Sequence, residues 1–226
     1  MKKDFDELTE YIKGLTEFKL PDYNELPKIN LYMEQVTTYI SETLAPLFKN
    51  DPSNIITPYM VNNYVKAKIV NPPKDKKYDT NHIGYLIFIS LLKTSANMRN
   101  LAALIEVDNQ IFKSDKNDLY RLFKEIQDDE LSKVLSHVLK KIDLANVKYE
   151  ESDQDEETKN NHYNLNMANL VLKLYVSSEV NKLIADSLMT ELTKEVLPKK
   201  ALEGQDIEKK LENIKIKKEA DKLKIR

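Results

Sequence analysis

The positions of the prolines constrain this chain more than any other feature, because proline cannot continue an α-helix from its interior. Pro58 directly follows Thr57, and this pair is typical of a helix start: threonine caps free N–H groups, and proline in the first turn costs no hydrogen bond. Pro72 and Pro73 prevent the helix from continuing beyond about Val70. The sequence therefore predicts a short helix between Thr57 and Val70.

Further helices are predicted on both sides of this segment. Apolar residues recur at helical spacing over residues 31–44, after Asn30 as a candidate N-cap. Another helix begins at Asp79 or Thr80 and runs through Lys93, and it is apolar on most sides, as a central buried helix would be. Charged residues make up 32% of the chain and glycine only three positions, a balance that favours helices over tight-turned sheets. We expect an all-α fold.

The remaining regions also carry helical patterns. Residues 4–15 predict a short helix that packs as an arm, and two separate amphipathic helices are expected over 119–126 and 131–142. The stretch 150–157 contains six acids and no apolar residue, which suggests a mobile linker. Beyond it, apolar residues keep a three-four spacing over 165–196. So long an apolar stripe needs another surface to cover it, within the chain or on a second subunit.

Several classes of function lose support from the sequence. Cysteine is absent, which excludes disulfides and thiolate metal sites, and the three histidines share no metal-binding spacing. Glycine-rich phosphate loops and nucleophile turns are absent as well. The start of the chain is unlike a signal peptide, and its longest apolar stretch is too short to span a bilayer. We expect a cytoplasmic protein, not an enzyme, with no cofactor, metal site or membrane contact.

The charge is distributed unevenly along the chain. The formal net charge is -2, yet residues 52–93 contain six lysines, two aspartates and no glutamate, which makes this segment +4. A local concentration of basic residues in an otherwise acidic chain is what a DNA-binding module would show. A solvated surface is the simpler explanation for the lysines alone.

The helix predicted over residues 57–70 has two different faces. Met60, Val61, Tyr64 and Val65 fall together and are expected to pack. On the other side, positions i, i+3, i+4 and i+7 are occupied by Tyr59, Asn62, Asn63 and Lys66. Asparagine pairs with adenine edges in the major groove, and tyrosine and lysine contact phosphates. The second face is therefore a candidate for reading DNA.

The same residues carry a family resemblance. The run from Thr57 to Pro73, followed by Lys76-Lys77-Tyr78 and His82-Ile83, resembles the recognition helix, wing and following helix of MerR-type regulators. Residues 31–93 are more closely similar to an uncharacterised bacterial family, a domain of unknown function with that predicted topology. MerR-type proteins usually carry Arg-Tyr-Tyr where this chain has Asn62-Asn63-Tyr64, and glycine where it has Lys68.

The resemblance implies a MerR-like helix-turn-helix with a short wing, followed by a helical C-terminal region with one long helix. The expected division is a packing arm at 1–30, the helix-turn-helix domain at 31–127, and a region for dimerisation or sensing at 128–226. The predicted function is sequence-specific binding of double-stranded DNA by a homodimer joined through the 163–197 helix. An interaction module that reuses the fold without DNA is the alternative. The predicted DNA-binding residues are Thr57, Tyr59, Asn62, Asn63, Lys66, Lys68, Lys74, Lys76, Lys77 and Tyr78.

Overall fold

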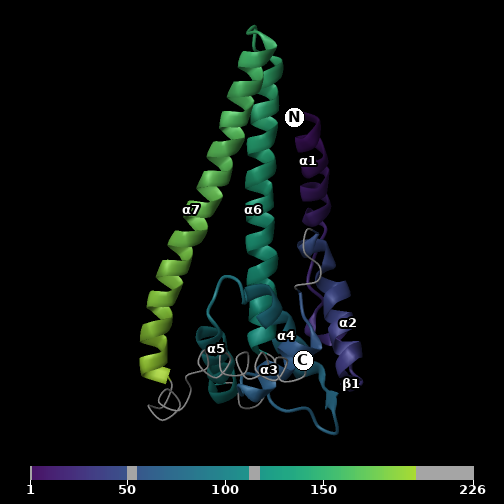
Figure 1. Cartoon of the computed structure of the whole chain (residues 1–226). Helices are drawn as coiled ribbons and strands as arrows, with labels where there is room; N and C mark the ends of the chain where they lie inside the picture. Colours follow the sequence, from purple (N-terminus) through teal and green to yellow (C-terminus); the bar gives the residue numbers. More distant parts are fainter. Residues whose placement is uncertain (1, 50–54, 112–117, 197–226) are drawn as a thin grey trace, which may run out of the picture. The chain divides into compact units, whose positions relative to one another are not determined.

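The structure, a computed structural model, describes residues 2–49, 55–111 and 118–196. Over these residues it contains seven α-helices and a single two-stranded antiparallel sheet, so the predicted all-α class is confirmed (Figure 1). No helix in the described part is long and apolar enough to cross a membrane.

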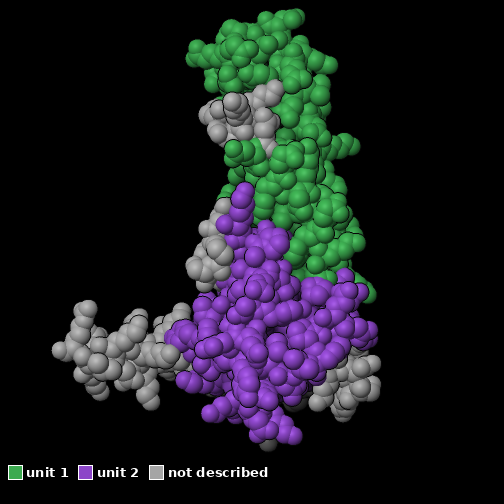
Figure 2. Space-filling model, turned by 90° about the vertical axis from the view of Figure 1, so that its right-hand side faces the viewer, with its two compact units in different colours: residues 1–20, 125–184 green, residues 21–124, 185–226 purple. Residues whose placement is uncertain are grey.

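The chain forms two units, which are coloured separately in Figure 2. One unit combines residues 1–20 with 125–184, and the other combines 21–124 with 185–226. In the first of these units the first helix packs with the last two. The division predicted at residues 30 and 127 stays a prediction. The C-terminal end of the predicted 128–226 region lies outside the described residues.

The unit that contains residues 21–124 begins with short elements. A 3-10 turn η1 (Tyr23–Glu25) precedes the strand β1 (Leu31–Tyr32), the helix α2 (Met33–Leu44) and a second 3-10 turn η2 (Ala45–Phe48). The helix predicted from residue 31 therefore starts two residues later. The reason is non-local: Leu31 and Tyr32 pair as a strand with Tyr78 and Lys77 of β2 (Lys77–Tyr78).

Helix α3 (Pro58–Lys66) begins where the sequence predicts, with the hydroxyl of Thr57 accepting a hydrogen bond from the N–H of Met60 at 3.2 Å. Its end also lies within the predicted limit. Two backbone bonds close it, from the N–H of Ile69 to the carbonyl of Tyr64 and from the N–H of Lys68 to Val65. This pair defines a Schellman motif, which needs a left-handed residue, and Lys68 has a φ of 60°.

Helix α4 (Thr80–Leu92) is the buried centre of this unit, as predicted. Every residue from Ile83 to Ser90 is buried. Helix α5 (Met98–Ile111) and the start of α6 (Asp118–Glu150) also belong to the unit, with Phe123 of α6 meeting Phe88 of α4 edge to face at 5.2 Å between ring centroids. Gly84 lets Tyr120 approach α4 closely, because a Cβ at this position would lie 3.3 Å from the tyrosine ring.

The other unit is built from α1 (Lys2–Thr16), the rest of α6, and α7 (Glu156–Val196) as far as residue 184. Ile12 of α1 joins one apolar cluster with residues of α6 and α7. The buried members of this cluster from the two long helices are Leu135, Val138, Ile142, Ala145, Tyr163 and Met167.

Two sequence expectations are corrected in this unit. The helices expected over 119–126 and 131–142 form the single helix α6, because neither proline nor glycine interrupts the polar residues between them. The acidic stretch 150–157 ends α6, forms a hydrogen-bonded turn at 151–155 and begins α7, where the sequence predicts a mobile linker. Asp155 caps α7 there, and its carboxylate accepts hydrogen bonds from the N–H and the hydroxyl of Thr158 at 2.9 and 2.7 Å.

The left-handed backbone at Lys68 leads to a stability prediction. Replacing Lys68 by Gly is expected to raise the free energy of unfolding by about 1 kcal/mol, because the left-handed region costs an L-residue roughly 1–2 kcal/mol and the freer unfolded chain cancels part of the gain. Urea denaturation followed by circular dichroism measures the change. The matched control is Lys66→Gly at the last residue of α3, where glycine is a poorer helix former than lysine and is expected to lower stability. A Lys68→Gly protein no more stable than the wild type would contradict the prediction.

Candidate DNA-contacting surface

Helix α3 presents a narrower polar face than the sequence predicts. Asn62 and Lys66 are exposed and Tyr59 is half-buried, whereas Val61 and Tyr64 pack into the core of the unit. Burial raises the pKa of the Tyr64 hydroxyl above its ordinary value, so this side chain stays a neutral core residue. Two of the four residues on the predicted reading face are thus open to solvent, and a third is partly so.

Asn63 does not belong to the exposed face, which corrects the prediction that it reads DNA. Its side chain is only 6% exposed, and its Oδ1 atom has no hydrogen-bond partner among the residues that the structure describes. One residue turns the helix by about 100°, and this step carries Asn63 from the side of Asn62 into the packed interior. A buried amide cannot reach a base edge.

The segment after α3 places the predicted wing residues in a tight turn. Asp75 and Lys76 have φ values of 52° and 62°, and the N–H of Lys77 bonds the carbonyl of Lys74 at 2.9 Å. Two successive positive φ values define a type I′ turn, in which an asparagine-glycine pair is favoured. Lys68 and the turn residues Lys74 and Lys76 are exposed.

Three other predicted site residues have structural contacts. Tyr78 is 3% exposed, so it is corrected from a DNA contact to a core residue whose ring meets His82 edge to face. Thr57 caps α3 through its hydroxyl. The ammonium of Lys77 lies 5.0 Å from the ring centroid of Tyr32, within the range of a cation–π contact, and remains half-exposed.

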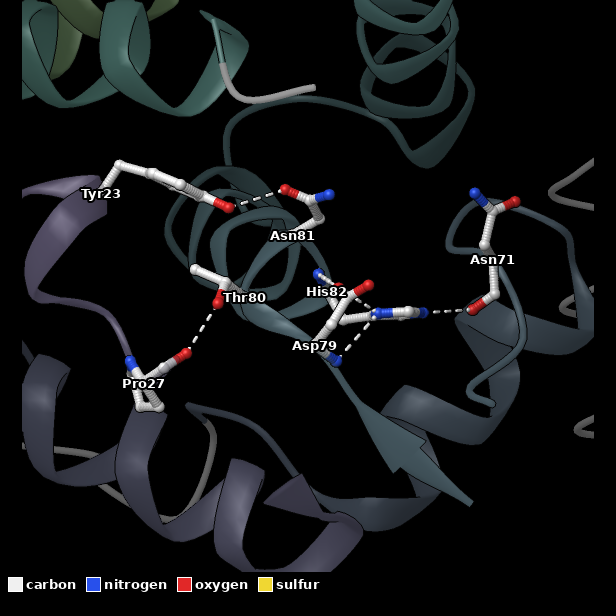
Figure 3. A network of polar contacts seen from close by, with 7 residues as sticks. All are labelled: Tyr23, Pro27, Asn71, Asp79, Thr80, Asn81 and His82. Carbon is white, nitrogen blue, oxygen red and sulfur yellow. Dashed lines mark hydrogen bonds and ion pairs between the residues drawn. The ribbon is translucent and has the colours of Figure 1, made fainter. Parts of the chain in front are cut away.

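A polar network that the sequence analysis did not identify fixes the first turn of α4 (Figure 3). The carboxylate of Asp79 accepts a hydrogen bond from the N–H of His82 at 3.0 Å and lies 2.6 Å from the ring Nδ1. The ring Nε2 lies 3.2 Å from the carbonyl oxygen of Asn71, in the chain that follows α3. Burial alone would raise the pKa of Asp79, but the hydrogen bonds and the charge interaction with His82 lower it below its ordinary value.

The same turn of α4 is also tied to the beginning of the unit. The hydroxyl of Thr80 donates to the carbonyl of Pro27 at 2.7 Å, and the hydroxyl of Tyr23 donates to the Asn81 side chain at 3.0 Å. Of these contacts, only the one between Asp79 and His82 could be expected from the sequence, because a residue that caps a helix bonds a group three residues further on. The partners at 23, 27 and 71 are brought together by folding.

A second network missed by the sequence lies deeper in the unit. The hydroxyl of Tyr85 donates to the buried carboxylate of Asp108 at 2.7 Å, and the other oxygen of that carboxylate accepts from the N–H of Leu119 at 3.0 Å. Burial and the hydrogen bond to Asp108 raise the pKa of Tyr85 far above its ordinary value. Asp108 therefore joins α4, α5 and α6 as a structural residue. The described residues contain no cluster of three or more potential metal ligands.

Comparisons with known proteins agree with the outline of this unit. Residues 21–126 match the family model described as Domain of unknown function (DUF1836). The match begins at residue 21 and ends within two residues of 124, so it covers the N-terminal segment of this unit and not the segment at 185–226. Neither the curated proteins nor the solved structures contain a match to this chain. The similarity to an uncharacterised family is therefore confirmed over 21–126.

The Asp79 cap predicts a pH dependence of stability. Because the folded-state pKa of Asp79 lies below its ordinary value, ionisation of this carboxyl stabilises the fold above that ordinary value, and the contribution disappears as the pH falls through the folded pKa. In an Asp79→Asn variant the amide would still cap the helix but cannot titrate. The difference in unfolding free energy between wild type and this variant should therefore shrink as the pH falls from 5 toward about 2. A difference that grows over this interval would contradict the assignment.

Proposed function

We propose that residues 21–124 form the DNA-contacting part of a transcriptional regulator, with α3 as the helix that enters the major groove. The observation that carries the proposal is the exposure of Asn62 and Lys66 on a helix that is fixed at both ends. Thr57 and Pro58 hold its start, and the Schellman motif holds its end. A rigid short helix with a polar outer face is the element that helix-turn-helix proteins place in DNA.

The chemistry of the exposed side chains fits this role. The amide of Asn62 can both donate and accept, which matches the N6 and N7 atoms of adenine. Tyr59 and Lys66 flank Asn62 at the spacing of one helical turn and suit phosphate oxygens. Asn62 would supply sequence preference, and its neighbours would supply affinity and register.

The turn at Lys74–Lys77 would add a sequence-independent contribution. Lys74 and Lys76 are exposed at its tip, and β2 anchors it against β1. Lysines at such a position neutralise phosphates and release counterions, so their contribution falls as salt rises. The resemblance of this helix, turn and following helix to MerR-type regulators supports the same interpretation.

A regulator of this kind binds DNA as a dimer, and α7 offers the surface for it. Tyr163 and Met167 of α7 are buried against α6. Leu165, Leu172 and Val176 lie on the opposite side of the same helix and are 54–61% exposed. Because the two faces point in opposite directions, no movement of α7 toward α6 can cover the second one. A second copy of the chain would cover it.

The spacing of the exposed stripe favours an antiparallel pair. Its members lie three, four, four, four and three residues apart, a pattern that is the same in both directions along the helix. In an antiparallel pair centred near Leu174, every member would therefore face another apolar member of the partner subunit. The stripe consists of Leu165, Ala168, Leu172, Val176, Val180 and Leu183.

The energetics are consistent with a concentration-dependent dimer. Full burial of a valine or leucine side chain stabilises by roughly 1.5–3 kcal/mol, and about half of each large side chain in the stripe remains to be buried. Two copies with five such residues each would gain on the order of 10 kcal/mol, which is comparable to the cost of association at about 4–15 kcal/mol. The stripe alone would support a dimer of moderate affinity. Dimeric helix-turn-helix regulators bind half-sites about one DNA turn apart, and under this proposal we expect the same spacing.

The DNA-binding proposal predicts separable effects of two substitutions. Duplexes selected from a random pool are expected to bind wild type more tightly than scrambled duplexes, and Asn62→Ala should reduce that preference by roughly 1–3 kcal/mol. Lys76→Gly removes a charge without straining the turn and should weaken binding to all sequences. The plot of log binding constant against log salt concentration should become less steep by about 1. Fluorescence anisotropy at several salt concentrations measures both effects.

The controls for this experiment lie outside the proposed surface. Asn161→Ala and Lys133→Ala remove an exposed amide and an exposed ammonium from α7 and α6, and both should leave DNA binding unchanged. Wild-type protein that selects no duplex over heparin would refute DNA recognition and favour the alternative interaction module.

The dimer proposal is tested by cross-linking, because a chain without cysteine gains a unique thiol from one substitution. Leu165→Cys and Leu183→Cys proteins are expected to form disulfides when mixed and to remain largely uncross-linked when separate. A parallel pair would give the reverse result. In analytical sedimentation, Leu172→Glu should raise the dissociation constant of the dimer at least tenfold, whereas Ser178→Glu, which lies off the stripe, should leave it unchanged. A wild-type protein that stays monomeric at high concentration would eliminate this mechanism.

A further inference from the structure

The hairpin of α6 and α7 carries a groove that the DNA-binding proposal does not use. Two adjoining depressions of about 240 and 220 Å³ lie between these helices and share Ala145, Lys148 and Asn166. We refer to them together as the basic groove. Its basic lining residues are Lys141, Lys148, Lys159, His162 and Lys173, and no carboxylate lines either depression.

Three lysines of the basic groove differ from two other lysines in the same unit. Lys13 and Lys133 form ion pairs with carboxylates three or four residues away. Among the described residues, Lys141, Lys148 and Lys173 have no such ion pair. Three like charges are therefore held on one side of a helical hairpin without internal compensation. Such a surface favours an anionic partner.

The floor of the basic groove is apolar. Ala145 and Tyr163 are buried beneath it, and Leu144, Leu165 and Leu170 also line it. The Tyr163 ring is held edge to face by Tyr149, whose hydroxyl donates to Glu156 at 2.7 Å. The acidic turn limits the groove at that end. An apolar floor between cationic edges suits a ligand that combines apolar and anionic groups.

We propose that the basic groove binds an acidic amphipathic helix of another protein. Lys141 and Lys148 are seven residues apart on α6, and Asn166 and Lys173 are seven apart on α7. Seven residues of helix span about 10.5 Å, which is also the distance between carboxylates at i and i+7 of a docked helix. The leucines of such a helix would fill the floor. A nucleic acid duplex places its charges more closely and exposes little apolar surface, and a second copy would present the same lysines and be repelled.

A designed peptide provides the probe. It has about 21 residues, enough for six turns of helix, with leucines along one helical face and glutamates at seven-residue intervals on both flanks. A matched peptide carries lysine in place of glutamate. With the full-length protein we expect the acidic peptide to bind at least tenfold more tightly than the basic one in fluorescence anisotropy. The triple variant Lys141→Glu, Lys148→Glu, Lys173→Glu should reverse this order. These side chains are exposed, so the variant should retain the helical circular dichroism spectrum.

The matched control reverses three exposed lysines outside the basic groove, Lys19, Lys140 and Lys182, and should keep the preference for the acidic peptide. The proposal is overturned if the control loses the preference as strongly as the groove variant, or if the wild type does not distinguish the peptides. Displacement of the acidic peptide by a short DNA duplex would assign the groove to nucleic acid instead. Loss of self-association in the groove variant would assign it to a second copy. The proposal does not depend on α3 contacting DNA.

Discussion

The burial of α4 is the constraint on which the unit at 21–124 depends. Every residue from Ile83 to Ser90 is inside, so this helix has no solvent face and the other elements must surround it. Its first turn is then bonded to two separate segments, through His82 to Asn71, and through Thr80 and Asn81 to Pro27 and Tyr23. Those bonds set the position of the chain that leaves α3. The orientation of the candidate DNA-contacting helix is thereby linked to the core.

The unit built on α6 and α7 differs in that the described residues leave part of the apolar surface of α7 uncovered. Tyr163 and Met167 are buried on the side of α7 that packs against α6, while the stripe that includes Leu172 and Leu183 remains exposed. Monomeric proteins rarely leave contiguous apolar surface of this extent, and where they do it marks an interaction site. The uncovered stripe and the basic groove share only Leu165, at one end of each. Two kinds of contact can therefore be proposed for this hairpin, one apolar and one electrostatic.

Local signals account for what the sequence predicted correctly. Thr57, Pro58 and Asp79 act within one helical turn, so the starts of α3 and α4 could be read from neighbouring residues alone. The late start of α2 depends on Leu31 pairing with Tyr78, a residue far along the chain. The same limitation applies to Asp108, because nothing near it in the sequence indicates its contact with Tyr85.

The candidate site shows the same limit. Helical spacing places Asn62, Asn63 and Lys66 near one another, but it does not determine where the packed surface begins, and Asn63 lies on the buried side of that boundary. The lysine-lined groove was not predicted at all, since Lys148 and Lys173 come together only when α6 and α7 pair.

Under the two proposals, the distribution of charge would give these surfaces their selectivity. A chain with a net charge of -2 has little general attraction for polyanions, so binding to DNA or to an acidic helix depends on where its lysines are concentrated. The turn at Lys74 and Lys76 and the groove at Lys141 and Lys148 are two such concentrations, in different units. They differ in what accompanies the charge. An exposed amide on α3 suits base edges, whereas an apolar floor in the groove suits leucine side chains, so under both proposals the neutral groups would decide which anionic partner each surface accepts.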